Sequence, residues 1–216
     1  MNTEMLLLRI PAILLALTFH EYCHGWVASL RGDSTARDLG RLTFNPFAHL
    51  DIFGTLMLLF GPFGWAKPVP VNFSNLKDPK KDSIYISAAG PVSNILLACI
   101  AGYAYRLFLM NNTFLGSRAG YVDQFFIMLI QINLGISFFN LLPVPPLDGS
   151  KILMGLLPSS KVPSYIRYME KAPLIFLILI VVEWSFNIPT ISLILYPLYM
   201  PYRSFWLFII FGGKAL

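Results

Sequence analysis

Charged residues are scarce in this chain of 216 residues: they make up 12% of it, whereas 56% of the residues are hydrophobic. Soluble domains carry about 25% charged residues, so the deficit excludes a water-facing surface of this size. Cysteine is also rare, and Cys23 and Cys99 both lie in apolar stretches, which excludes a disulfide framework. We therefore expect one integral membrane domain over residues 1–216, in contact with the lipid bilayer.

Long runs of basic residues are missing as well. The net charge of +5 comes from Lys and Arg at the ends of apolar segments, which is a membrane topology signal and excludes a nucleic-acid partner. Residues 31–83 contain seven Lys or Arg, whereas residues 111–121 contain only Arg118. The positive-inside rule places residues 31–83 in the cytoplasm and the N-terminus outside. The first apolar stretch has no basic segment before it, so we expect a retained span, not a cleaved signal peptide.

Apolar segments of spanning length predict an all-α polytopic fold. Residues 52–66 are too short and too rich in glycine to cross the bilayer, so a re-entrant hairpin is expected there. The alternation in Arg41–Phe44 predicts a short β-strand. One or two further spans are expected within residues 173–211. The predicted core lies within about residues 5–155 and consists of three helices, over about 5–28, 84–110 and 122–153.

Histidine occurs only three times, yet two histidines stand four residues apart in His20-Glu21-Tyr22-Cys23-His24. Residues four apart share one face of a helix, so the two imidazoles can bind one Zn²⁺. The H-E-x-x-H pattern makes Glu21 the general base that takes a proton from water. Ionisable groups within a span are costly, and a bound metal offsets that cost.

A catalytic zinc has three protein ligands and an open position. Asp148 is the favoured third ligand, because it lies in a proline-broken segment at membrane depth, where an isolated carboxylate is costly. His49 and Cys23 are weaker candidates: His49 follows a turn and Cys23 fits a packing role. For His20 and Asp148 to lie at one depth, an even number of crossings must separate them. The segments 84–110 and 122–148 already supply two crossings, so residues 52–66 are expected to form a hairpin and not a third crossing.

Three motifs together resemble the site-2 protease family of intramembrane zinc metalloproteases, in a compact form without a PDZ or nucleotide-sensing domain. The resemblance covers residues 15 to about 155. The motifs are His20-Glu21-x-x-His24, Gly90-Pro91-x-x-Asn94 and Asn140-x-x-Pro143-x-Pro145-Pro146-Leu147-Asp148-Gly149.

The resemblance implies cleavage of a peptide bond within or near the membrane segment of a single-span protein, known as regulated intramembrane proteolysis. It implies His20, His24 and Asp148 as ligands of one Zn²⁺, with Glu21 as the base. Asn94 and Asn140 are expected near the site, where either amide could hold the substrate backbone or donate to the oxyanion. The alternative for both is a hydrogen bond between helices.

Other functions fit part of the pattern. A metal permease, or another metal-binding membrane protein without peptidase activity, would also use intramembrane His and Asp. It does not explain why Glu21 stands between the two histidines. A different membrane zinc peptidase would draw a distal glutamate as its third ligand, but neither Glu170 nor Glu183 lies in a matching motif. An inactive relative is disfavoured because the acid–base residues are all present.

Overall fold

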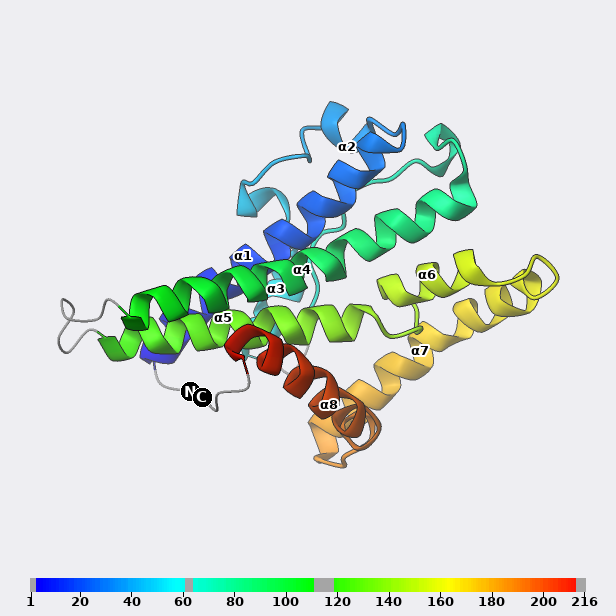
Figure 1. Cartoon of the computed structure of the whole chain (residues 1–216). Coiled ribbons are helices and arrows are strands. Elements are labelled where there is room, and N and C mark those ends of the chain that lie inside the picture. The colour runs from blue at the N-terminus through cyan, green and yellow to red at the C-terminus, as the bar shows by residue number, and fades with distance from the viewer. Residues whose placement is uncertain (1–2, 61–63, 111–118, 213–216) are drawn as a thin grey trace.

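The computed structural model describes residues 3–60, 64–110 and 119–212, and these residues form helices joined by loops (Figure 1). Two short 3-10 helices, η1 (Pro46–Ala48) and η2 (Phe73–Asn75), lie in the first long loop. The α-helices are α1 (Thr3–Leu30), α2 (Thr35–Asp38), α3 (Ile52–Phe60), α4 (Pro79–Met110), α5 (Ala119–Asn140), α6 (Asp148–Leu156), α7 (Val162–Phe186) and α8 (Ile191–Phe211).

Helices α1, α4 and α5 pack against one another and form the centre of the molecule, while α7 and α8 diverge from them (Figure 1). Ala12, Ala16 and Ala98 are completely buried between these helices. Small side chains let helix backbones approach closely, which is how membrane helices gain packing energy. The predicted three-helix core is therefore present, and its close packing fixes the relative positions of side chains on α1, α4 and α5.

Within the described part of the chain, four helices are long and apolar enough to cross a membrane, within Glu4–Leu30, Pro79–Phe108, Gly120–Asn140 and Ile191–Phe211. Large apolar side chains such as Leu7, Ile100 and Leu193 point outward and are more than half exposed. In water this exposure would be costly, whereas lipid accepts it. The last of the four helices is one of the predicted C-terminal spans, and α7 precedes it as the other arm of a helical hairpin.

The third predicted core segment, over about 122–153, forms two helices in the structure, as its proline-rich break predicts. Helix α5 ends at Asn140, and α6 begins at Asp148. The seven residues between them include Pro143, Pro145 and Pro146, and proline removes a backbone donor and clashes with the preceding turn of a helix. The break places Asp148 in the first turn of a new helix and thereby directs its side chain.

The predicted strand at Arg41–Phe44 is wrong, since no β-strand occurs among the residues that the structure describes. The backbone N–H groups of Arg41 and Leu42 both donate to the carbonyl of Ala36, which continues the turn after α2. The neighbouring segment 67–71 has prolines at positions 68 and 70 and so lacks two of the donors that a β-ladder needs. Only the guanidinium of Arg41 bridges the two, donating to backbone oxygens of that segment.

Helix α3 lies in the region where a re-entrant hairpin was predicted. Its nine residues rise about 14 Å, which is less than half of the hydrocarbon thickness. It is too short to cross, in keeping with the parity argument above. Residues 61–63, where the predicted hairpin would turn, lie outside the described part of the chain, so the return of the chain to the same side stays a prediction.

A buried carboxylate ties the first long loop to the end of α1. Asp33 is fully buried and accepts hydrogen bonds from the backbone N–H groups of Thr35 and Asn72 and from the amide of Asn75. Burial by itself raises the pKa of the Asp33 carboxyl, but these hydrogen bonds and that of the Thr35 hydroxyl outweigh it and hold the pKa below its ordinary value. The ionised side chain therefore stabilises the folded loop.

We expect Asp33→Asn to lower the free energy of unfolding by about 2 kcal/mol, because an uncharged amide replaces a multiply bonded carboxylate. A lowered pKa in the folded state means that the stabilisation is present above the unfolded pKa of about 3.9 and is lost as the pH falls through the folded value. Thermal unfolding in detergent at pH 7 and pH 3 measures this. If the difference in stability between wild type and Asp33→Asn is as large at pH 3 as at pH 7, the ionised Asp33 carboxylate is not what stabilises the loop.

Candidate metal centre

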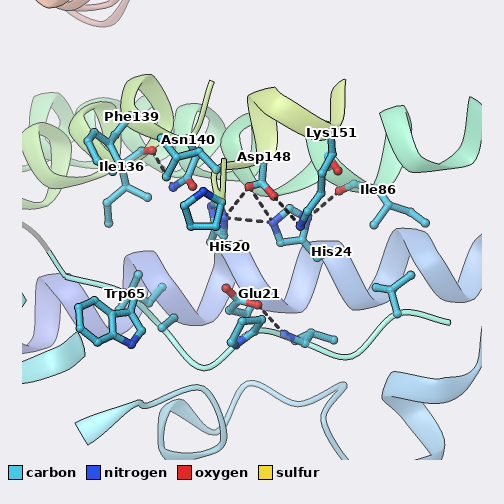
Figure 2. Close-up of a pocket in the computed structure, with 18 of the residues that line it drawn as sticks. His20, Glu21, His24, Trp65, Ile86, Ile136, Phe139, Asn140, Asp148 and Lys151 are labelled. Carbon is cyan, nitrogen blue, oxygen red and sulfur yellow. Dashed lines mark hydrogen bonds and ion pairs between the residues drawn. The ribbon is translucent and has the colours of Figure 1, made fainter. Parts of the chain in front are cut away.

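A cavity of about 600 Å³ lies between α1, α4, the α5–α6 break and the extended segment 64–73. His20, Glu21 and His24 on α1 line it together with Asp148 from α6 (Figure 2). All four side chains are buried, although each is ionisable. Four such groups around one buried cavity mark it as the candidate functional site.

The three predicted ligands converge on one point. The Nε2 atoms of His20 and His24 lie 3.0 Å apart, and each lies 3.1 Å from Oδ2 of Asp148. In a tetrahedral zinc site with ligands at about 2.0–2.1 Å, neighbouring ligand atoms are about 3.3 Å apart. The observed triangle fits one such ion with only small side-chain adjustments. Among the described residues, only these three form a group of His, Cys, Asp or Glu that could hold a metal ion.

The second ring nitrogen of each histidine faces a carbonyl oxygen. The Nδ1–H of His20 donates to Oδ1 of Asn94 at 2.7 Å, and the Nδ1–H of His24 donates to the backbone oxygen of Ile86 at 2.6 Å. This hydrogen-bond network assigns the tautomers. A neutral imidazole carries one proton, so both Nε2 atoms present lone pairs to each other and to a carboxylate. Three electron-rich atoms that meet without a proton between them are stabilised by a cation, and their partners orient them for one.

Asn94 contacts the Nδ1 side of His20 and is not among the described residues that line the cavity. It is completely buried, and its amide nitrogen donates to the backbone oxygen of Ala16 at 3.0 Å and to Oδ1 of Asn133 at 2.8 Å. Both ends of the amide are thus occupied. These contacts orient His20 and join α4 to α1 and α5, which favours the helix–helix alternative for Asn94.

Asn133 on α5 belongs to the hydrogen-bond network of the site, although no sequence motif indicates it. It is completely buried, supports Asn94, and donates to the backbone oxygen of Leu129. A signal was available, because Asn133 is an amide in the middle of an apolar span and must find a hydrogen-bond partner there. The identity of that partner was hidden, since Asn133 and Asn94 are 39 positions apart.

Glu21 faces the cavity from the opposite side to Asp148 (Figure 2). Its Oε2 atom accepts a hydrogen bond from the backbone N–H of Val69 at 2.8 Å. Val69 belongs to the extended segment 64–73, which thereby holds one carboxylate oxygen and leaves Oε1 for water. This arrangement suits a general base, which must be fixed by one contact and free at the other.

Of the three remaining candidate residues, one lines the cavity and two do not. Asn140, at the end of α5, lines the cavity, and its amide nitrogen donates to the backbone oxygen of Ile136 at 3.1 Å. His49 is buried in the first loop and donates from Nε2 to the backbone oxygen of Thr43. Cys23 is half-buried on α1. Neither of these last two joins the ligand group, so Asp148 is the third member of the cluster.

Comparison with known proteins places these observations in a family. The family model described as peptidase family M50 matches residues 112–182, which include Asp148. The "Putative zinc metalloprotease YwhC" of Bacillus subtilis (strain 168) is 46% identical over 149 residues, which is 68% of this chain and 67% of that protein. The chain belongs to peptidase family M50. No solved structure matches it.

Membership of family M50 confirms the resemblance to site-2 proteases drawn from the motifs. The M50 chain is a metalloprotease, and with four helices of spanning length among its described residues it is an integral, multi-pass membrane protein. The family implies zinc as the metal, and the cluster of His20, His24 and Asp148 fits it. The sequence-predicted base, Glu21, lines the same cavity.

Proposed function

We propose that this protein is an intramembrane zinc endopeptidase of the site-2 protease type. It hydrolyses a peptide bond within or near the transmembrane segment of a membrane protein, in regulated intramembrane proteolysis. One Zn²⁺ per chain is held by His20, His24 and Asp148, and Glu21 is the general base.

One observation supports the proposal above the others: the Nε2 atoms of two imidazoles and a carboxylate oxygen converge in one buried cavity beside α1, α4 and α5. The Nδ1–H groups of His20 and His24 are committed to carbonyl oxygens, so neither ring can turn away from the cluster without losing a buried hydrogen bond. Such a preformed, open three-ligand set is typical of catalytic zinc. A structural zinc site would have four protein ligands.

The chemistry assigned to each group follows from its position. When bound, zinc supplies a Lewis acid that acidifies water and polarises a carbonyl. The carboxylate of Glu21 takes the proton from the attacking water through Oε1, while Val69 holds Oε2. Glu21 then returns this proton to the nitrogen of the leaving amine. Asn94 keeps His20 in the required tautomer throughout.

The walls of the cavity support a membrane-embedded segment as substrate. Leu17, Ile136 and Phe139 line it beside the ligands, and Trp65 closes the side of the extended segment (Figure 2). An apolar stretch of a single-span protein suits these surfaces better than a polar peptide does. Segment 64–73 also belongs to the basic region 31–83, which supports an active site toward the cytoplasm and an N-terminus outside.

Removal of the metal tests the proposal directly. We expect the purified protein to contain about one zinc per chain, and a chelator to abolish cleavage of a single-span model substrate in liposomes. One equivalent of zinc should restore cleavage. Atomic absorption measures the metal, and gel analysis of the substrate measures cleavage. Continued cleavage by protein shown to be metal-free would refute the proposed function.

A further inference from the structure

Lys151 is a cationic residue that lines the cavity, and the mechanism described above gives it no role. It stands three residues after Asp148 on α6, and its side chain is 45% exposed. Among the described residues that line the cavity, it is the only Lys or Arg.

The ion pair of Lys151 with Asp148 does not use the hydrogen-bond donors of the ammonium group. Its Nζ lies 3.8 Å from Oδ1 of Asp148, which is an ion pair but too long for a hydrogen bond. An ammonium group has three N–H donors, and the structure gives Nζ no hydrogen-bond acceptor among the described residues. The group therefore has donors to offer within one side-chain length of the metal ligands.

The position of Lys151 is complementary to that of the base. Glu21 approaches the ligand cluster from α1 and the extended segment, whereas Lys151 approaches it from α6 (Figure 2). A scissile peptide between them would have water activated on the Glu21 side and its carbonyl oxygen turned toward the ammonium group of Lys151. Donors aimed at the place where negative charge develops give the largest electrostatic stabilisation in acyl transfer.

We propose that the ammonium group of Lys151 is a second electrophile, which donates a hydrogen bond to the oxyanion of the tetrahedral intermediate. This inference rests on the proposed protease function. The water oxygen bonds to the carbonyl carbon while Glu21 accepts a water proton, and the carbonyl π electrons move onto oxygen. Lys151 Nζ–H donates to that oxyanion. The carbonyl then re-forms, the C–N bond breaks, and the proton on Glu21 passes to the amine nitrogen.

The proposal is tested by Lys151→Met, which keeps an unbranched side chain of the length of the lysine stem and removes the ammonium donors. We expect kcat to fall by about 100-fold with KM changed less than about twofold, because the interaction forms only in the transition state. Zinc content should stay at the wild-type value. Lys151→Arg, which retains cationic donors, should recover at least about a tenth of wild-type kcat.

A second readout does not depend on turnover. An apolar peptide with a phosphinate in place of the scissile amide mimics the tetrahedral oxyanion, and calorimetry measures its binding to the zinc-loaded protein. Lys151→Met should bind it about 100-fold more weakly than wild type, with binding of the unmodified peptide unchanged. Lys161→Met is the matched control, since Lys161 is exposed in the loop before α7.

Three results would overturn the inference: unchanged kcat in Lys151→Met, equal binding of the phosphinate peptide, or loss of zinc together with activity. The last would mean that Lys151 acts only through Asp148. The first and the third of these results presuppose a wild-type protein that cleaves the model substrate, whereas the binding result does not. A wild-type protein that binds zinc but cleaves nothing would instead refute the proposed function, so the two failures are distinguishable.

Discussion

Glu21→Gln is expected to lower cleavage of a membrane substrate by about 1,000-fold or more while the protein keeps its zinc. Glutamine has the same shape as glutamate, and its amide oxygen can still accept the hydrogen bond from Val69 that holds Oε2 in the native protein. It cannot accept a proton from water or return one to the amine, and general acid–base catalysis contributes about 10²–10⁴-fold. The cleavage rate and the zinc content of the same preparation provide the measurement.

This variant also separates the protease from a metal permease. A permease uses the ligands but has no need of a proton acceptor between them, so Glu21→Gln would leave transport of metal into liposomes intact. Retained cleavage by Glu21→Gln would remove Glu21 from the mechanism. Glu170→Gln is the matched control, because Glu170 is exposed on α7 and is not among the residues that line the cavity. The Glu170→Gln protein should cleave the substrate at the wild-type rate.

Gly90→Ala is expected to lower the affinity for zinc, and with it cleavage, by about 100-fold. A Cβ atom at position 90 would overlap Nε2 of His24 and would lie 2.6 Å from Nε2 and Cε1 of His20. Neither ring can retreat, because Asn94 and the carbonyl of Ile86 hold their Nδ1 atoms. Forcing one methyl group into such a site costs about 1–3 kcal/mol and displaces the ligand atoms.

A zinc titration against a competing chelator measures this effect. Gly120→Ala provides the control, because a Cβ atom at the start of α5 would meet nothing within 4 Å. That variant should bind zinc and cleave substrate as wild type does. If Gly90→Ala also keeps wild-type zinc affinity in a folded protein, the two imidazoles are not packed against α4 in the way described above.

Several features of the site could be predicted from the sequence because they depend on local periodicity. His20 and His24 share a helix face at any position in the fold, since one helical turn separates them. Asp148 could be nominated because a carboxylate beside a proline-rich break is costly in a membrane without a ligand. The prolines at positions 143, 145 and 146 predict a break at the end of this span, and the structure confirms it between Asn140 and Asp148.

The strand predicted at residues 41–44 is absent from the structure because it has no suitable partner. Alternation of apolar and polar residues records which side of a segment is buried, but a strand also needs a partner with free N–H and C=O groups. The segment that lies nearby contains prolines at positions 68 and 70 and cannot supply a regular ladder. No local pattern in residues 41–44 reveals this.

The sequence by itself determined that the chain is a membrane protein, that two histidines and a glutamate share one helix, and that a distant aspartate is available as a ligand. These follow from composition and from contacts between residues a few positions apart. Only the tertiary structure decided that Asn94 orients His20, that Val69 holds Glu21 and that Lys151 faces the same cavity. These relations join different segments of the chain, and only the packing of α1, α4 and α5–α6 brings them together.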